Sequence, residues 1–161
     1  MGELRDSIEI DVAPERVWHW LMGLAHHYTK WHPAHVSAEW ERGEPNQIGS
    51  VLTIVEVLAG HRERLRLEVT LVDAPHRLEY RLRGAHSLVF PRGAFVVSEV
   101  NGHARFDATL AYRPGALVEL AFRRRAAALR VHMREEGLSL KQILEAAEVR
   151  DTNRRGSLNN R

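Results

Sequence analysis

Histidines gather near the N-terminus of this sequence, in the stretch HHYTKWHPAH that runs from His26 to His35. Four of the chain's 10 histidines lie within it, next to aromatic side chains. Imidazole exchanges protons near neutral pH and is a common metal ligand. The stretch therefore fits a metal site, a clamp on a substrate or a polar loop. The candidates for chemistry are His27, His32 and His35, whereas His26 is expected to be exposed.

A lone carboxylate interrupts the most apolar stretch of the chain. Glu56 is the only charged residue between Val51 and Ala59, and apolar residues fill both alternating faces around it. An unpaired buried carboxylate costs several kcal/mol or takes up a proton, and a metal ion or a cationic partner removes that cost. Glu56 is thus a candidate metal ligand. The alternative is a glutamate at a strand end that pairs with an arginine.

A third candidate lies in the C-terminal part, within the segment HMREEGLSLK. His132 and Glu136 are four residues apart, so on a helix they lie on one face, one turn apart. Apolar Leu129 and Leu140 continue the same stripe. Two ligands with this spacing can hold one metal ion, as the two histidines of an HExxH helix do. Such pairs also occur on solvated helix faces, so this spacing alone is a weak signal.

The spacing of apolar residues predicts the elements that carry these groups. A period of about 3.6 predicts an amphipathic helix from Pro14 to Met22 and a long helix from residue 116 to about 149. The histidine-rich stretch follows the first helix as a second short helix or a loop. Asn101-Gly102 is a strong hairpin signal. A period of two predicts strands over residues 7–12, 36–40, 50–58, 65–71, 78–82, 88–100 and 104–112.

This order of elements predicts an α+β fold in which a curved antiparallel sheet wraps around a long C-terminal helix. The sheet must bury its concave face, and the long helix is the only element able to cover it. Such a layout leaves a cavity between sheet and helix, and we expect Trp31 and Tyr80 to line it. We expect a single domain over residues 1–150 and a disordered polar tail over residues 151–161.

The composition narrows the classes of function. The chain has 161 residues and no cysteine, which excludes disulfides and thiolate metal sites. A net charge of +2 does not call for a nucleic-acid or membrane partner. There is no apolar signal segment at the N-terminus and no run of about 18 apolar residues. We therefore expect a soluble, cytoplasmic protein. The basic run at residues 123–125 is expected to be a solvated helix face; contact with an acidic ligand or a macromolecular partner is the alternative.

Beyond these patterns, the sequence resembles known families. IEIDVAPERVWHWL resembles the first strand and helix of the START-like, helix-grip (SRPBCC) superfamily, which includes polyketide cyclases and lipid-binding proteins. The combination of HYTKWHPAH, IVEVLAG and HMREEGLSLKQILE is similar to the metal-dependent diacetylphloroglucinol and phloretin hydrolase family. This resemblance extends from Ile8 to Glu145. The chain is much shorter than the hydrolases of that family.

The resemblance to the hydrolases implies a zinc site, or a site for another divalent ion. Its ligands would be His27, Glu56, His132 and Glu136, a set of two histidines and two carboxylates that suits zinc. His32 and His35 would then be catalytic residues that support the ligands or transfer protons. A rival assignment, in which His32 or His35 takes the place of His27 as a ligand, stays open.

Two functions follow from these expectations. The first is a zinc-dependent hydrolase in which a metal-activated water attacks a ketone carbonyl of an acylated phenolic or polyketide-like molecule. His32 or His35 would deliver a proton to the departing ring carbon as the carbon–carbon bond breaks. The second is a polyketide cyclase-like or purely ligand-binding protein, whose cavity holds a hydrophobic molecule without metal chemistry. Elemental analysis of the purified protein distinguishes the two.

Overall fold

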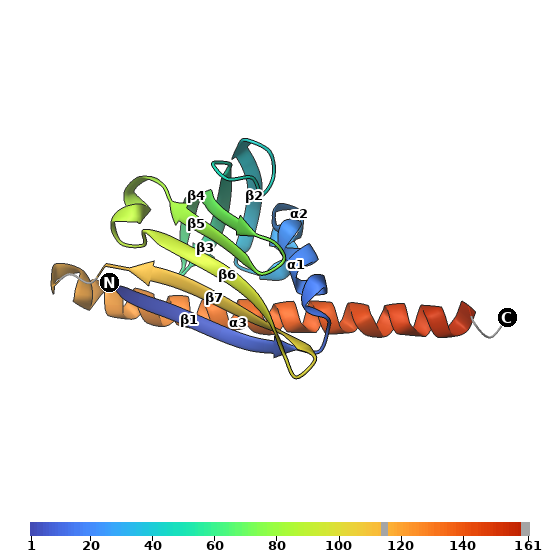
Figure 1. The fold of residues 1–161 in the computed structure, drawn as a ribbon. Coiled ribbons are helices and arrows are strands. Elements are labelled where there is room, and N and C mark those ends of the chain that lie inside the picture. Colours follow the sequence, from blue (N-terminus) through green and yellow to red (C-terminus); the bar gives the residue numbers. More distant parts are fainter. Residues whose placement is uncertain (114–115, 159–161) are drawn as a thin grey trace.

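The structure, a computed structural model, describes residues 1–113 and 116–158, with residues 116–124, 155, 156 and 158 described by their backbone alone. The described chain forms one sheet, three α-helices and a short 3-10 helix (Figure 1). The strands are β1 (Gly2–Ile10), β2 (His35–Arg42), β3 (Val51–Leu58), β4 (His61–Asp73), β5 (Arg77–Leu82), β6 (Arg92–Val100) and β7 (His103–Tyr112). The helices are α1 (Pro14–Met22), α2 (Leu24–Trp31), η1 (Gly84–Leu88) and α3 (Ala116–Leu158).

All neighbouring strands of the sheet are antiparallel, in the order β1-β7-β6-β5-β4-β3-β2. Successive hairpins build most of it, and the β6–β7 turn has positive φ angles of 53° at Asn101 and 82° at Gly102, as a two-residue hairpin turn requires. The first strand, β1, pairs with the last strand, β7, and forms one edge of the sheet. The predicted curved antiparallel sheet is confirmed.

The long helix α3 runs along the sheet and packs against β1 (Figure 1). Its inward side chains include the fully buried Leu140, together with Leu129, Met133 and Leu144, which join one hydrophobic core with the strands. Gly137 faces β1, where an added Cβ atom would lie 3.0 Å from Oδ2 of Asp6. The helix-grip class predicted from the sequence is confirmed.

The two short helices connect β1 to the opposite edge of the sheet. Pro14 occupies the first turn of α1, where its missing N–H is not needed. In α2 the buried side chains are Leu24, Tyr28 and Trp31, spaced so that they share one face of the helix. This spacing turns the exposed His26 away from that face and leaves the half-buried His27 at its edge. The second short helix ends just before the His32-Pro33 corner that leads into β2.

The structure differs from the sequence-based expectation most clearly at three places. β1 begins at Gly2 instead of Ser7, and Gly2 pairs with Tyr112. Residues 84–88 form η1, and β6 begins only at Arg92, because Pro91 has no N–H to donate to a sheet ladder. At the C-terminus, α3 continues through residues 151–158, where we expected a tail, while residues 159–161 lie outside the described part.

Ion pairs connect the C-terminal part of α3 to α1. Arg16 of α1 lies 3.3 Å from a carboxylate oxygen of Glu148 and 3.0 Å from one of Asp151. These contacts join α3 to α1 near residues 148–151. No helix among the described residues is both long and apolar enough to span a membrane.

Candidate functional site

A cavity of about 110 Å³ lies between the sheet and α3. Trp31 and Tyr80 are among the residues that line it. Most of the wall is apolar, with contributions from Leu24, Ile54, Leu58, Leu65, Leu67, Leu82, Phe90, Phe95, Ala108, Leu110, Leu129 and Met133. The polar lining residues are Tyr28, Glu56, Glu63, His86, Thr109, Arg125, His132 and Glu136. The wall therefore suits a hydrophobic molecule with a few polar groups.

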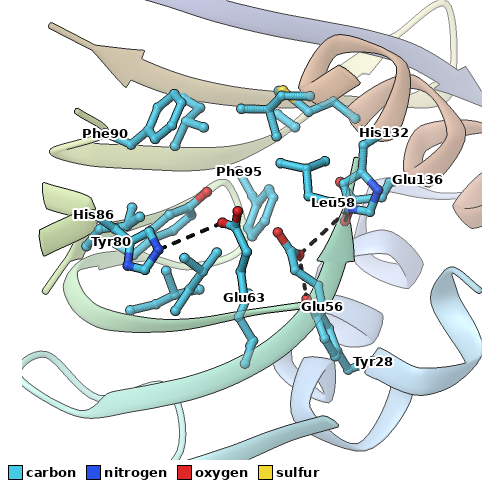
Figure 2. A pocket seen from close by; sticks show the side chains of 18 of the residues that line it. Tyr28, Glu56, Leu58, Glu63, Tyr80, His86, Phe90, Phe95, His132 and Glu136 are labelled. Atoms are coloured by element: carbon cyan, nitrogen blue, oxygen red, sulfur yellow. Dashed lines mark hydrogen bonds and ion pairs between the residues drawn. The ribbon is translucent and has the colours of Figure 1, made fainter. Parts of the chain in front are cut away.

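Three ionisable residues form one row across the sheet. His35 at the start of β2 is the cross-strand partner of Glu56 in β3, and Glu56 is in turn the partner of Glu63 in β4. Cross-strand partners have their Cβ atoms about 5 Å apart on one face of the sheet. Figure 2 shows Glu56 and Glu63 both pointing into the cavity. Strand pairing thus brings residues from three strands to one place.

The helix α3 completes a buried group that we call the histidine–glutamate cluster, made of His35, Glu56, His132 and Glu136. Nε2 of His35 lies 2.9 Å from Oε1 of Glu136 and 3.4 Å from Nε2 of His132. Nε2 of His132 lies 3.4 Å from Oε1 of Glu136 and 3.8 Å from Oε2 of Glu56. The one-turn spacing of His132 and Glu136 aims both side chains at the same point.

Contacts with Tyr28 fix the orientation of the His35 ring. Its Nδ1 lies 2.9 Å from the carbonyl oxygen of Tyr28, and the two rings stack with centroids 3.9 Å apart. A carbonyl oxygen can only accept a hydrogen bond, so Nδ1 carries a proton. In the neutral ring Nε2 then carries a lone pair. That lone pair faces a Glu136 oxygen at 2.9 Å. Two acceptors at this distance repel unless a proton or a metal ion lies between them.

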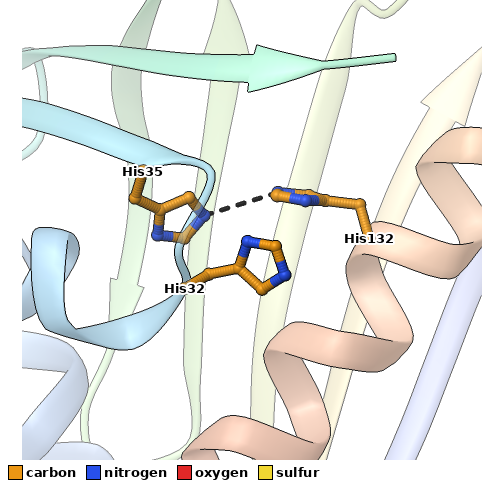
Figure 3. A group of neighbouring side chains, drawn as sticks. All are labelled: His32, His35 and His132. Carbon is orange, nitrogen blue, oxygen red and sulfur yellow. Dashed lines mark hydrogen bonds between the residues drawn. The ribbon is translucent and has the colours of Figure 1, made fainter. Parts of the chain in front are cut away.

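His32 lies at the solvent side of the cluster. The N–H of Ala34 donates to its Nδ1 at 3.1 Å, which leaves the proton on Nε2, 3.0 Å from Oε2 of Glu135. Its ring centroid is 4.6 Å from that of His132. His32, His35 and His132 each offer a ring nitrogen within 4.8 Å of the others (Figure 3). His32 therefore connects the buried cluster to an exposed carboxylate.

The structure does not bring His27 into the cluster. Its ring stacks on Trp20 with centroids 5.2 Å apart, and its Nε2 packs so close to Gly23 that a Cβ there would lie 2.8 Å away. The buried face of α2 carries Leu24, Tyr28 and Trp31, which leaves His27 on the side toward α1. Burial lowers the pKa of His27. The histidine beside Glu56 is His35, which fits the rival assignment.

The environment sets the charges of the cluster. Burial raises the pKa of Glu56, and the Tyr28 hydroxyl donates to its Oε2 at 2.9 Å. Burial acts to lower the pKa of His132, but the Glu136 and Glu56 carboxylates outweigh it and raise that pKa overall. Burial acts to raise the pKa of Glu136, but His132 and His35 lower it overall. The arrangement therefore favours an ionised Glu136 beside a protonated His132 and a Glu56 that retains its proton to higher pH.

A second polar group lies in the cavity wall, and the sequence did not single it out. Glu63 forms an ion pair with Arg125 of α3, and Nε2 of His86 lies 3.8 Å from Oε2 of Glu63. Only 11% of the Glu63 side chain is exposed, and Glu63 and His86 both line the cavity. The signal was the parity that Glu63 shares with inward-facing Leu65.

The donor atoms of the histidine–glutamate cluster fit a divalent metal ion. They are two imidazole nitrogens and two carboxylate oxygens, a set that zinc accepts. Tetrahedral zinc with bonds of about 2.0–2.1 Å needs neighbouring donors roughly 3.3 Å apart. The donor separations given above are 2.9–3.4 Å among His35, His132 and Glu136, and 3.8 Å between His132 and Glu56. The carbonyl behind His35 is the kind of outer contact that orients metal-binding histidines.

Comparison with known proteins agrees with this fold. A family model described as polyketide cyclase / dehydrase and lipid transport matches residues 1–145. The chain therefore belongs to this polyketide cyclase / dehydrase and lipid transport family, a branch of the START-like superfamily. No curated protein is significantly similar to it in sequence.

Several solved structures share the fold. TTHA0849 from Thermus thermophilus is 20% identical with a TM-score of 0.74, over 91% of this chain and 99% of that one. The Zhui aromatase/cyclase from Streptomyces sp. R1128 is 14% identical with a TM-score of 0.70, over 89% and 93%. Ara h 8.0201 is 12% identical with a TM-score of 0.63, over 90% and 98%. These likenesses show the fold, and the family favours a cyclase-like or ligand-binding protein over a hydrolase.

Proposed function

We propose that this protein binds a small hydrophobic molecule with polar substituents in the cavity, and that the histidine–glutamate cluster exchanges protons with it. The observation that carries the proposal is the junction of an apolar cavity with a buried group of acids and bases. Glu56, His132 and Glu136 line the cavity and belong to the cluster. The family to which the chain belongs supports a ligand of this class.

The apolar residues of the cavity wall would provide affinity for the ligand, and the ionisable residues would transfer protons. Transfer of an apolar ring from water to the leucine and phenylalanine wall drives binding. Glu56 retains a proton to a higher pH than usual because of its burial, so it is suited to donate one to a carbonyl oxygen. The ionised Glu136 carboxylate, paired with the protonated His132, is placed to accept a proton from an acidic carbon next to that carbonyl. Such a proton exchange is the chemistry that cyclisation and dehydration of a polyketide need.

Binding of 2-naphthol, a neutral two-ring probe, tests this function. We expect saturable binding, measured by its fluorescence, in the micromolar to millimolar range. Leu65→Trp should fill the cavity and abolish binding, because Leu65 lines it. Leu138→Trp is the matched control, because Leu138 is 43% exposed on α3 and does not line the cavity. Equal binding by both variants would place the ligand elsewhere and refute the proposal.

A second candidate function is metal dependent, and the separations between the cluster's donor atoms favour it. We propose that His35, Glu56, His132 and Glu136 hold a divalent ion, zinc being the best match to the donor set. A bound ion would polarise a carbonyl of the ligand, which is the chemistry expected of the hydrolase suggested by the sequence resemblance. His32, with its proton on Nε2 and Glu135 behind it, would relay protons between solvent and the cluster.

Metal content distinguishes the two ligand assignments. Elemental analysis after reconstitution with zinc and desalting should find about one ion per chain. His35→Ala should lose that ion, whereas His27→Ala should keep it, because the His27 ring lies against Trp20 instead of the cluster. Loss in His27→Ala with retention in His35→Ala would reverse the assignment. Absence of zinc from the wild-type protein would leave the metal-free function alone.

A further inference from the structure

The Glu63–Arg125 ion pair points to a property of the ligand. We infer that Glu63 makes the cavity select neutral ligands over carboxylic acids, because its carboxylate already occupies the arginine that an acid would need. The inference rests on the proposed function, since it concerns the ligand of the same cavity. It assigns Glu63 the role of a specificity-determining residue.

The position of the pair supports this role. Glu63 comes from β4, His86 from η1 and Arg125 from α3, so the group spans the cavity from sheet to helix. The Glu63 side chain is 11% exposed and that of Arg125 is 43% exposed. Figure 2 shows the Glu63 carboxylate turned into the cavity, between His86 and the neighbouring Glu56. A ligand in the cavity would therefore meet this carboxylate.

The charges of the cavity wall also favour neutral ligands over carboxylic acids. Arg125 is the only arginine or lysine among the described residues that line the cavity. Three carboxyl groups, those of Glu56, Glu63 and Glu136, share the same wall. A ligand carboxylate would add a further negative charge near the ionised Glu63 and Glu136 carboxylates, and repulsion between like charges is strong where water is scarce. A neutral hydroxyl can instead donate a hydrogen bond to any of these oxygens.

The partners of each carboxyl group explain why Arg125 does not offset this repulsion. Two acidic residues directly opposite one another across two strands need separate partners, and Glu56 and Glu63 are such a pair. Tyr28 and His132 contact Glu56, whereas Arg125 and His86 contact Glu63. One nitrogen of the guanidinium, Nη2, is thus paired with Glu63. An acid that took over this nitrogen would leave the largely buried Glu63 carboxylate without its partner.

The experiment compares 2-naphthol with 2-naphthoate, which has the same ring system and carries a carboxylate. The wild-type protein should bind naphthol at least about tenfold more tightly, by fluorescence titration at pH 7. Glu63→Gln keeps the size of the side chain and frees Arg125, so the affinity ratio should shift toward naphthoate by at least about tenfold. The double variant Glu63→Gln/Arg125→Gln should return the ratio toward the wild-type value. Glu63→Leu gives a second test of the charge if the glutamine variant does not fold.

The outcomes separate this inference from the proposed function. An unchanged ratio in Glu63→Gln and in Glu63→Leu would overturn the role of Glu63 and leave the binding function intact. Failure of the wild-type protein to bind either probe would overturn both. The titrations are made before and after chelation, because Glu63 and Arg125 are outside the histidine–glutamate cluster. A shift of the ratio in both states is expected, and a shift seen only with metal present would contradict the inference.

Discussion

His35 and Glu56 are direct cross-strand partners at the end of the sheet, although the loop between β2 and β3 separates them in the sequence. This pairing brings the first residue of β2 to the carboxylate that interrupts the apolar β3. The helical pair His132 and Glu136 then meets them from α3. The site is therefore formed by strand register and by one helical turn together, and neither element alone creates it.

The first prediction concerns the cost of burying Glu56. Its pKa is raised by burial, so its folded form holds a proton that the unfolded form loses above about pH 4.5. Stability contributed by the protonated form is lost as the pH rises toward the folded pKa. Glu56→Gln imitates the protonated acid and can still accept from Tyr28. In the metal-free protein at pH 8 it should raise the free energy of unfolding by about 1 kcal/mol.

Urea denaturation in the presence of a chelator measures this change. Glu39→Gln, on the exposed part of β2, is the matched control and should change the free energy of unfolding by less than about 0.5 kcal/mol. A clear loss of stability in Glu56→Gln would mean that the carboxylate is already compensated by its neighbours. Added zinc should stabilise the wild-type protein but not Glu56→Gln, if Glu56 is a ligand.

The second prediction concerns the tyrosine that supports the cluster. Tyr28 donates to Glu56 and is 2% exposed, so Tyr28→Phe leaves a buried carboxyl oxygen without its donor. We expect a loss of about 1–3 kcal/mol in the free energy of unfolding. Tyr80→Phe is the control in the same wall, because its hydroxyl has no hydrogen-bond partner among the described residues. Thermal denaturation of the two variants side by side should show the larger drop for Tyr28→Phe, and equal drops would contradict the hydrogen bond.

The third prediction is a pH window of stability for the metal-free protein. The lowered pKa of Glu136 gives stability that is complete above its ordinary value of 4.5 and is lost as the pH falls through the lowered value. The raised pKa of His132 gives stability that is complete below its ordinary value of 6.5 and is lost as the pH rises through the raised value. Both contributions are complete between 4.5 and 6.5.

Melting temperatures recorded with a chelator from about pH 4 to pH 9 test this window. His132→Gln removes the titrating imidazole and also the partner of the Glu136 carboxylate. The melting temperature of this variant should therefore change less with pH, both below pH 4.5 and above pH 6.5. Variation of His103 serves as a control, because that residue is 51% exposed and pairs with Asp11 far from the cluster. A profile of His132→Gln that parallels the wild-type profile would show that other groups set the pH dependence.

Much of the fold could be predicted because it follows from local patterns. Alternation of apolar residues identified the strands, Asn101-Gly102 fixed a hairpin, and the change to a helical period after residue 114 placed the long helix. The anomaly of Glu56 within β3 and the spacing of His132 and Glu136 are also local signals. Each was visible because burial of a charge breaks an apolar pattern.

The sequence did not show the register in which neighbouring strands pair. Which histidine meets Glu56 depends on how β2 aligns with β3, and this pairing contains irregularities after His35 and near Trp40. The sequence of α2 did not show whether His27 or Tyr28 would face inward, because both lie within one helical turn of apolar Leu24 or Trp31. Glu63 was missed for a similar reason: a charge near a strand end has two acceptable environments, and only the position of Arg125 on α3 decides between them.

The central claim is that the ligand lies in the cavity against the histidine–glutamate cluster, and NMR of the histidine side chains tests it most directly. Protein labelled with ¹⁵N in its histidines is titrated with 2-naphthol, and the ring resonances are followed. His132 lines the cavity, and His35 contacts His132. The ring resonances of both histidines should therefore shift, and should saturate together with the fluorescence signal. The resonances of His27 and of exposed His103 should stay in place. Saturable binding without any shift at His132 or His35 would contradict the account.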